Sequence, residues 1–593
     1  MKKKIYNIKK AGLMALMGIL GMTQTGCSDF LEIEPLNEII LEKFWTEKAD
    51  VDGIIAGCYS GMQSQDIVKR MMVWGEFRSD NIGIGQNINN DQNLEKVLKE
   101  NIDAKNGYTT WDGFYSIINR CNTVLKYAPE VAAADPAYTQ SELNANIAEV
   151  TALRSLCYFY LIRTFRDVPY STVAFTDDNV EMALPATKFD AVLDSLIASL
   201  ESVKSMAVRR YPETEPLYQT GRITQDAIYA MLCEMYLWKQ DYDNCIRYAD
   251  LVIASKKQIA EDNRSLSMSL GTTSSSTQND ERFNGFPLIN GNSSTNTYGN
   301  AYRFLFGSDD YYSRYNQEII FQLIFDDDPR GNSMITNGAA NTFYGNATSR
   351  VGLAAPSDFV LEDINKTSSR NIFADRNKKV DARMYENCDV DRKSVNKFVT
   401  QTVSINTTST TPTVSYGSAY ADGYNSSNWV IYRLTDIMLM KAEALVQKLH
   451  TGNDQADVTY NTPIIDQAFT LINAVNKRSV CQSVLVDTLV RTDYGTKKQM
   501  EELVYQERQR ELMFEGKRWY DLVRIARREG STSTLASAAL RKVTTSSSLI
   551  ANKLAKMDAI YWPYNYEELK VNLLLEQNPA FDSGENSSYE KNY

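Results

Sequence analysis

Apolar residues recur every three or four positions over long stretches of this 593-residue chain. Between residues 144 and 165, for example, Ile147, Val150, Leu153 and Leu161 belong to one stripe, and the polar residues lie elsewhere. This spacing places side chains on one face of an α-helix. An amphipathic helix buries its apolar face against a neighbour, so the chain is constrained to form a body of many packed helices.

The same spacing predicts a helical hairpin between residues 224 and 254, with a turn at residues 240–243. Cys233 and Cys245 place small side chains on its two helices, which allows close packing, and the hairpin looks like a tetratricopeptide repeat. The predicted fold is therefore mostly α, with a scaffold of tetratricopeptide-like hairpins. Further helices are predicted at residues 50–62, 111–127, 189–206, 433–448, 464–477 and 498–528.

Two stretches have a different composition. Residues 265–345 and 400–428 are rich in Ser, Thr, Asn and Gly, with Tyr and Phe interspersed. These small and polar residues favour turns and loops. Long segments without regular structure are uncommon in compact proteins unless they are functional or disordered. Because of the interspersed rings, we interpret both stretches as ordered, irregular loops that carry a binding site.

The charge balance and the scarcity of histidine exclude several classes of function. The chain has 63 Lys and Arg against 74 Asp and Glu, a net charge of −11, whereas a protein that neutralises phosphates needs the opposite sign. Nucleic acid is therefore not an expected partner. His450 is the single histidine, so any Ser-His-Asp or Cys-His mechanism would depend on it. His450 lies at the end of a helical pattern, and we interpret it as a solvated helix-end residue.

The N-terminus has the features of an export signal. Residues 1–26 contain five lysines and no acidic residue, followed by an apolar run at residues 11–22 that is too short to cross a bilayer as a helix. Cys27 comes directly after this segment, as in a bacterial lipoprotein signal, where the cysteine is acylated. Its fatty acids would anchor the protein to a membrane. The alternative is a plain secreted protein in which Cys27 is incidental.

Successive motifs resemble those of the SusD/RagB family, in family order from Cys27 to the end of the chain. The first motif is Trp-Gly-Glu-Phe-Arg-Ser-Asp-Asn at residues 74–81, and a later one carries Arg166 where the family usually has glycine. The other motifs lie at residues 111–122, 152–169, 318–321, 381–383, 433–445, 507–524 and 562–579.

The resemblance implies a scaffold of four tetratricopeptide-like helix pairs with irregular loops that hold the ligand. It also implies a lipoprotein on the outer face of the outer membrane that captures a nutrient, most often a glycan. The expected partner is a SusC-type TonB-dependent transporter. We expect a signal peptide at residues 1–26, an N-terminal helical region at residues 27–260, and a C-terminal region with the binding loops at residues 261–593.

A sugar site needs aromatic rings for the C–H faces and polar side chains for the hydroxyl groups. The loops contain both, and for each ring the alternative is that it covers local core. A peptide cargo also remains open. The predicted ligand-binding residues are Asp80, Asn81, Tyr298, Tyr302, Phe343, Tyr344 and Tyr424.

Two other functions compete with a non-enzymatic binding protein. Glu507 and Glu511 lie one helical turn apart, and glycosidases use paired carboxylates, so a helical glycoside hydrolase is one alternative. The nearby Arg508, Arg510 and Arg518 would lower the pKa of these carboxylates, which favours a structural ion network. A tetratricopeptide scaffold that binds only protein is the second alternative.

No cofactor is expected. Calcium is the only metal that the sequence suggests, through the acidic residues 326–328 and through Asp389 with Asp391. The ligand spacing of a calcium loop is incomplete there, so an exposed acidic turn is the favoured interpretation.

Overall fold

The computed structural model describes residues 44–176, 181–212, 214–269, 283–291, 296–307, 317–326, 335–362, 369–374, 380–409, 411–452, 454–482, 488–542 and 547–582. The predicted signal and Cys27 lie outside these ranges. Contacts divide the chain at Thr46, and every element discussed below belongs to the unit that follows it. Within the described ranges, no helix is both long and apolar enough to cross a membrane.

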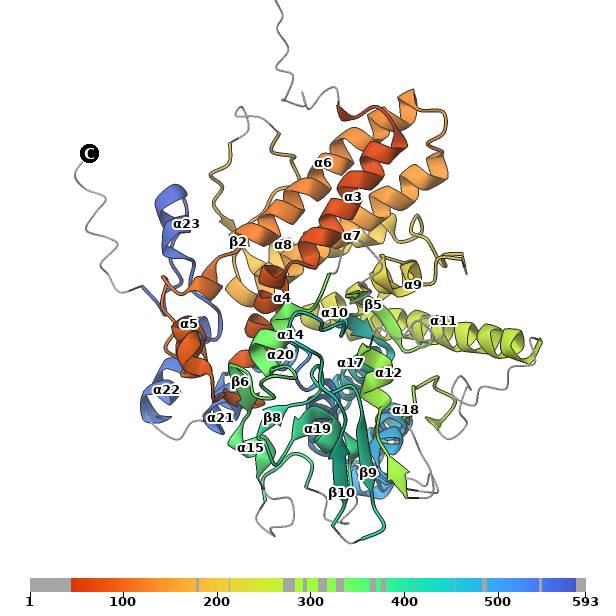
Figure 1. Ribbon diagram of the computed structural model, residues 1–593, viewed down its shortest axis with the longest axis vertical. Coiled ribbons are helices and arrows are strands. Elements are labelled where there is room, and N and C mark those ends of the chain that lie inside the picture. Colours follow the sequence, from red (N-terminus) through yellow and green to blue (C-terminus); the bar gives the residue numbers. More distant parts are fainter. Residues whose placement is uncertain are drawn as a thin grey trace, which may run out of the picture. The chain divides into compact units, whose positions relative to one another are not determined.

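Long helices packed against one another make up the part that we call the helical frame. It consists of α3 (Lys48–Met62), α6 (Asp112–Ala134), α7 (Gln140–Phe165), α8 (Phe189–Val203), α10 (Gln225–Lys239), α11 (Tyr242–Ser269), α17 (Leu434–Gln447), α18 (Gln455–Ser479), α19 (Lys497–Leu512) and α20 (Arg518–Glu529). Its first helices form a row in which α3, α6, α7, α8, α10 and α11 each contact the next (Figure 1). The predicted helices at residues 144–165 and the hairpin at residues 224–254 are confirmed.

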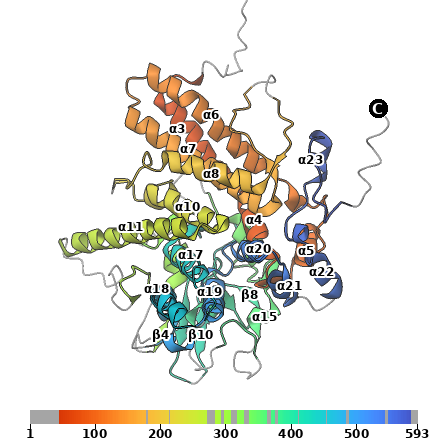
Figure 2. The same cartoon turned by 180° about the vertical axis from the view of Figure 1, so that it is seen from behind.

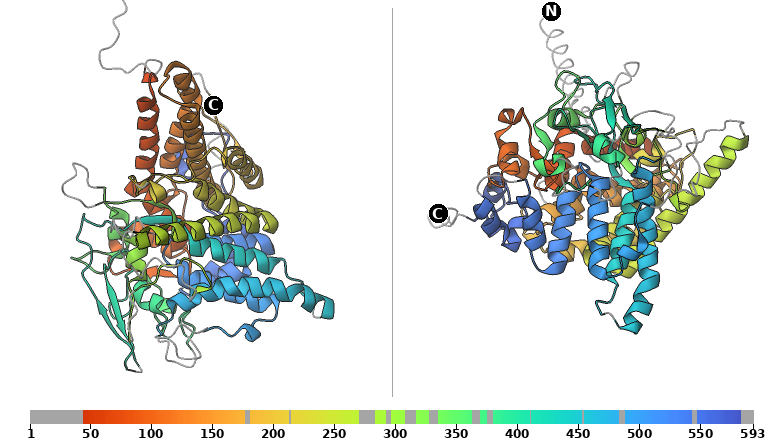
Figure 3. Two further views of the ribbon diagram at one scale, coloured as in Figure 1. Left: turned by 90° about the vertical axis from the view of Figure 1, so that its right-hand side faces the viewer. Right: turned by 90° about the horizontal axis from the view of Figure 1, so that it is seen from below.

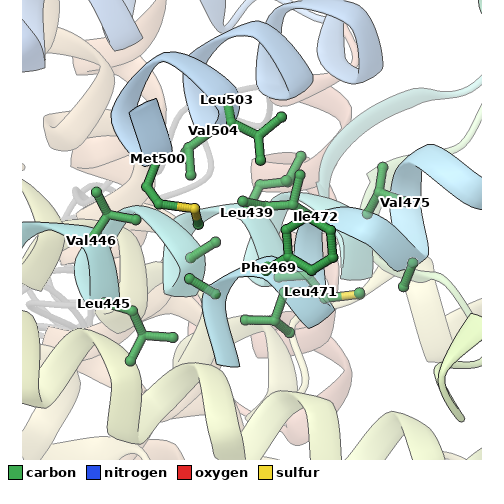
Figure 4. Close-up of a cluster of buried hydrophobic side chains, with 14 of the residues drawn as sticks. Leu439, Leu445, Val446, Phe469, Leu471, Ile472, Val475, Met500, Leu503 and Val504 are labelled. Atoms are coloured by element: carbon green, nitrogen blue, oxygen red, sulfur yellow. The ribbon is translucent and has the colours of Figure 1, made fainter. Parts of the chain in front are cut away.

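The row continues from α11 directly to α17, although residues 270–433 separate them in the sequence. Figure 2 and the left panel of Figure 3 show α11 beside α17, with α18 and α19 following. A core of buried side chains, including Leu439 of α17, Ile472 of α18 and Val504 of α19, holds these helices together (Figure 4). The helical frame is therefore one continuous stack into which the intervening segment is inserted.

The inserted segment has more regular structure than its composition predicts. It contains short strands that pair across long sequence distances, such as β4 with β9 and β5 with β11. The first predicted loop stretch also overlaps the end of α11. The expectation of long segments without regular structure is therefore corrected to short elements joined by loops. Its strands are β4 (Thr297–Tyr298), β5 (Ile319–Leu323), β6 (Ala354–Pro356), β7 (Cys388–Asp389), β8 (Ser394–Val395), β9 (Val403–Asn406), β10 (Thr413–Tyr416) and β11 (Trp429–Arg433), and its helices include α12 (Ala301–Phe306), α14 (Gly338–Tyr344), α15 (Asp358–Leu361) and α16 (Ala382–Asn387).

Shorter elements join the frame helices elsewhere. They comprise α4 (Gln65–Met72), the π-helix η2 (Val73–Phe77), β1 (Ile82–Ile84), η3 (Ile88–Asn90), α5 (Gln92–Leu98), η4 (Gly107–Thr109), β2 (Val168–Pro169), β3 (Ala186–Thr187), α9 (Tyr218–Gly221), η6 (Arg491–Asp493), α21 (Ser533–Leu540), α22 (Ser547–Leu554), η7 (Met557–Ile560) and α23 (Tyr566–Val571). All strand pairs are antiparallel, and Ile82 lies opposite Pro356 in the β1–β6 pair.

The prediction of a single helix at residues 498–528 is wrong, because the chain forms two helices there, α19 and α20, with a break between them. Phe514 and Gly516 have φ angles of 69° and 71°, which end a right-handed helix. At this break, a Cβ on Gly75 would lie 1.8 Å from the carbonyl oxygen of Gly516. The N-terminal motif and the C-terminal helices therefore touch backbone to backbone, which only glycine permits.

Candidate functional site

The first sequence motif lies against the junction between α19 and α20. Glu76 accepts hydrogen bonds from the backbone N–H groups of Phe514 at 3.0 Å and Lys517 at 3.2 Å. Asn81 donates to Glu76 Oε1 and accepts from Gln509 Nε2, both at 2.8 Å. Burial raises the pKa of the Glu76 carboxyl. This motif therefore connects segments from the two ends of the chain.

Asp80 belongs to the same connection. Its carboxylate binds Arg518 Nε at 2.9 Å and Arg541 Nη1 at 3.0 Å. Burial would raise the pKa of Asp80, but the charges of Arg518 and Arg541 and the hydrogen bond from Arg518 together lower it below its usual value. Asp80 and Asn81 are both fully buried, and the protein itself occupies their polar groups. Ligand contact by these two residues stays a prediction.

Glu507 and Glu511, the pair that suggested a glycosidase, lie inside a buried network of ion pairs. Arg383 binds Glu507 at 2.8 Å and Glu511 at 3.0 Å, and Arg433 and Arg478 also bind Glu511. Burial would raise the pKa of Glu511, but its three arginine partners hold the pKa well below its usual range. A general acid needs the opposite shift. The predicted structural ion network is confirmed.

The partners in this network differ from those expected. Of the three arginines close to the glutamates in sequence, Arg510 binds Glu507 at 2.7 Å. Arg508 instead pairs with Asp436 and Asp521, and Arg518 pairs with Asp80. The arginines that hold Glu511 come from α16, β11 and α18, which no local spacing in the sequence reveals.

Four of the predicted aromatic residues are buried. Phe343 packs against Phe77 with ring centroids 5.0 Å apart, and the Tyr344 hydroxyl donates to the carbonyl of Phe514 at 3.4 Å. Tyr298 and Tyr302 line a cavity of about 30 Å³, which has room for little more than one or two water molecules. In this structure these rings cover core, and ligand contact by them stays a prediction.

Three distant segments of the chain come together in what we call the loop surface, formed by residues 84–90, 345–352 and 417–424. The β1–β6 pair aligns the first two segments, and Asn87 Nδ2 donates to the carbonyl of Val351 at 2.9 Å. The backbone N–H of Ala347 donates to the carbonyl of Tyr420 at 2.8 Å, which fixes the third segment beside the second. Hydrogen bonds from both neighbours therefore order residues 345–352.

Five of the seven predicted residues flank or belong to the loop surface. Asp80 and Asn81 precede β1, Phe343 and Tyr344 precede the second segment, and Tyr424 ends the third. The Ser357 hydroxyl donates to the carbonyl of Asp80, which ties the end of β6 to the residues before β1. The buried members thus lie next to the surface in sequence, and Tyr424 is the member exposed on it.

The loop surface presents the chemistry that a polyhydroxylated ligand requires. Tyr424 has 51% of its surface exposed, and Ile84 has 47%. The same segments also carry exposed amide and hydroxyl side chains, on Gln86, Asn89 and Thr348. A ring can stack on the C–H face of a sugar while amides and hydroxyls bind its oxygen atoms.

Arg350 is a polar residue of the loop surface that the sequence analysis missed. It donates from Nη2 to the carbonyl of Gly417 at 2.7 Å and from Nη1 to Thr400 Oγ1 at 3.2 Å. It sits in a Ser- and Asn-rich run, so no periodicity or motif marks it. Only the pairing of the second and third segments reveals its position.

The remaining predictions concern metals and the single histidine. Within the described ranges, no group of three or more His, Cys, Asp and Glu residues could hold a metal ion. Asp389 is buried and binds Arg392 at 2.5 Å, which corrects the expectation of an exposed turn at that residue. Residues 327 and 328 lie outside the described ranges, and calcium stays the untested alternative. His450 follows α17, is 52% exposed, and stacks on Tyr460, as expected for a solvated helix-end residue.

Comparison with known proteins places this architecture among relatives. Residues 266–581 match the model of the SusD family, and residues 29–237 match one described as "Starch-binding associating with outer membrane". A SusD-like protein from Formosa agariphila is 24% identical over 599 residues, covering 98% of this chain and 100% of its own.

Solved structures show the same fold. A SusD superfamily protein from Bacteroides vulgatus gives a TM-score of 0.58 at 18% identity, covering 91% of this chain and 100% of its own. Surface glycan-binding protein A from Bacteroides thetaiotaomicron, in complex with laminarihexaose, gives a TM-score of 0.57 at 16% identity. The match covers 90% of this chain and 100% of that protein's chain. The predicted mostly helical, SusD-like fold is confirmed.

Proposed function

This chain belongs to the SusD family, and we propose that it is a cell-surface protein that binds an oligosaccharide on the loop surface and releases it unchanged. The observation that carries the proposal is an exposed tyrosine ring and exposed amide and hydroxyl side chains on three segments that hydrogen bonds hold together. The laminarihexaose complex of a protein with the same fold supports a saccharide as the class of ligand.

The proposed location is the outer face of the outer membrane, with fatty acids on Cys27 as the anchor. The lipoprotein-like leader supports this, as does the outer-membrane association named in the family model that matches residues 29–237. The proposed partner is a SusC-type TonB-dependent transporter that takes up the bound saccharide. That partner rests on the family resemblance.

Binding without catalysis is supported by the state of the paired glutamates. Glu507 and Glu511 are fully buried and ion-paired, so neither can protonate a glycosidic oxygen at the surface. A glycosidase needs one carboxyl with a raised pKa facing its substrate. The frame therefore uses this pair for structure.

A polysaccharide panel tests the binding proposal. The purified protein should retard on affinity gels that contain its cognate glycan and should leave that glycan intact. Replacing both Tyr420 and Tyr424 by alanine should abolish retardation. Release of hydrolysis products would favour a glycosidase, and unchanged function after loss of the tyrosines would favour a protein-binding scaffold.

Location and partner are tested in cells. Cys27→Ser should release the mature protein from the outer membrane, because the acylated residue is lost. Affinity purification of the tagged wild-type protein from solubilised outer membranes should recover a TonB-dependent transporter. Finding the protein in the cytosol with its leader intact would contradict the proposed location.

A further inference from the structure

Arg350 differs from most arginines of this protein because no acidic residue neutralises it. Arg383, Arg433 and Arg478 each bind at least one buried carboxylate at salt-bridge distance. Arg350 has only neutral partners, the hydroxyl of Thr400 and the carbonyl of Gly417. Among the described residues, no carboxylate oxygen lies within salt-bridge distance of it. Arg350 therefore forms no ion pair within the described part of the chain.

The charged groups nearest to Arg350 do not change this. Partial burial lowers the pKa of Arg350, the charge of Arg392 lowers it further, and Asp389 opposes both. The Asp389 carboxylate is already bound to the Arg392 side chain at 2.5 Å and to its backbone N–H at 3.1 Å. Arg392 itself is 52% exposed, on the turn between β7 and β8. Arg350 and Arg392 therefore both lie near Asp389, whose carboxylate already binds Arg392.

The position of Arg350 places its charge within the proposed binding surface. It belongs to the second segment, and its bond to Gly417 reaches the start of the third, which also carries Tyr424. Two bonds to fixed acceptors orient the guanidinium, which has five N–H donors, so three of them are left for another partner. Asp422, an exposed carboxylate on the third segment, forms no ion pair within the described part of the chain.

We infer that the saccharide bound on the loop surface is acidic, and that Arg350 binds its carboxylate or sulfate group. A planar guanidinium binds such groups through paired hydrogen bonds, and partial burial strengthens the contact. The whole chain carries a net charge of −11, so it repels anions in general, and a local cation that forms no ion pair within the described ranges is what an acidic ligand requires. This inference rests on the proposed function and adds the chemical class of the ligand.

Matched pairs of oligosaccharides test the inference by calorimetry on the purified protein. In the first pair, the acidic members are oligouronates, and the neutral members are the same oligomers after their carboxyl groups have been reduced to alcohols. The other is a set of sulfated oligogalactans and their desulfated forms. We expect one acidic form to bind about 10- to 100-fold more tightly than its neutral counterpart, the range for a hydrogen bond to a charged group. The pair that shows the preference identifies carboxylate or sulfate.

Variants assign the preference to Arg350. Arg350→Gln should remove most of the preference while leaving affinity for the neutral form within about threefold, and Arg350→Lys should retain part of it. Arg120→Gln is the matched control, because Arg120 on α6 also lacks a carboxylate partner within the described ranges and donates only to the carbonyl of Gly57. It should leave the preference intact.

A salt titration of the unaltered protein keeps the test independent of variant folding. Added salt should weaken binding of the acidic form and leave the neutral form unaffected, because salt screens charges. Equal affinity for both members of each pair would overturn the inference and leave the proposed function standing. No binding of any saccharide would overturn both.

Discussion

Glu511 in the helical frame and Glu386 beside the loops are both buried glutamates, yet their surroundings differ. Three arginines bind Glu511, and their charges lower its pKa well below the usual range despite burial. Glu386 accepts a backbone N–H from Ala301 at 2.8 Å but has no cation at salt-bridge distance within the described ranges. Burial therefore raises its pKa to about 7.

The same contrast holds for the cations. Arg433 of the buried ion network binds Glu318, Glu511 and Glu515, whereas Arg350 of the loop surface binds neutral oxygens. Charges in the buried network satisfy one another across the frame and the insert and fix the geometry. Glu386 and Arg350 have no such ion pairs within the described ranges and are left for titration or for a ligand. In this protein, the presence of an ion-pair partner, rather than the residue type, therefore distinguishes structural ionisable groups from functional ones.

The largest expected effect comes from breaking the buried ion network around Glu511. Glu511→Gln leaves three buried arginines without their shared charge and should lower the free energy of unfolding by about 3–5 kcal/mol, measured by urea denaturation. Glu502→Gln, at an exposed position on the same helix, should change it by less than about 0.5 kcal/mol. Similar small effects for both variants would remove the distinction between the two regions.

A pH series sharpens the comparison on the loop side. The folded pKa of Glu386 is raised to about 7, above the unfolded value of about 4.3, so the folded state binds the proton more tightly. Its contribution to stability is fully present below about pH 4 and is lost as the pH rises toward 7.

Glu386→Gln should therefore gain stability relative to wild type as the pH rises, by up to about 3 kcal/mol at pH 8. Unfolding of both proteins at pH 4, 6 and 8 measures this difference. A difference independent of pH would show that Glu386 is paired after all.

A smaller effect is expected at the surface ring. Tyr424→Ala should weaken glycan binding by about 0.5–1.5 kcal/mol, the range for loss of a stacked aromatic contact, and should leave stability nearly unchanged. Tyr460→Ala is the control, because Tyr460 is a 41% exposed tyrosine on α18 of the helical frame. Equal loss of binding in both variants would show that the loop surface has no special role.

The smallest effect concerns a strained residue in the frame. Arg166 has φ 71° and ψ −76°, which favours glycine, and its side chain forms partly exposed ion pairs with Asp167 and Asp558. Arg166→Gly should be more stable than Arg166→Ala by about 1 kcal/mol in thermal unfolding, because both lose the ion pairs but only glycine relieves the backbone. Equal stability of the two variants would show that the backbone carries no strain.

Much of the frame could be predicted from sequence because its helices carry their own apolar spacing, as α7 and the α10–α11 hairpin show. The break after α19 could not, since it depends on Gly75 approaching Gly516 from the other end of the chain. The short paired strands of the insert were missed for the same reason: partners such as β5 and β11 are remote in sequence.

The binding residues were harder to predict than the loops that carry them. Aromatic rings in a polar run look alike in sequence, but Tyr344 turns inward to Phe514 while Tyr424 is exposed. Arg350 carries no local signal, because what distinguishes it is the absence of a neutralising partner. That property exists only after the chain has folded.

The direct contact between α11 and α17 has a consequence for diversification. Because these helices are adjacent, the parts of the stack before and after the insert pack directly on each other. The insert can therefore vary while α11 and α17 keep their packing, provided that Arg383 and Arg433, which lie in the insert and bind Glu511 of α19, are kept. Grafting this segment onto a relative's scaffold, or a relative's segment onto this one, is therefore a rational way to transfer ligand preference between proteins of this architecture.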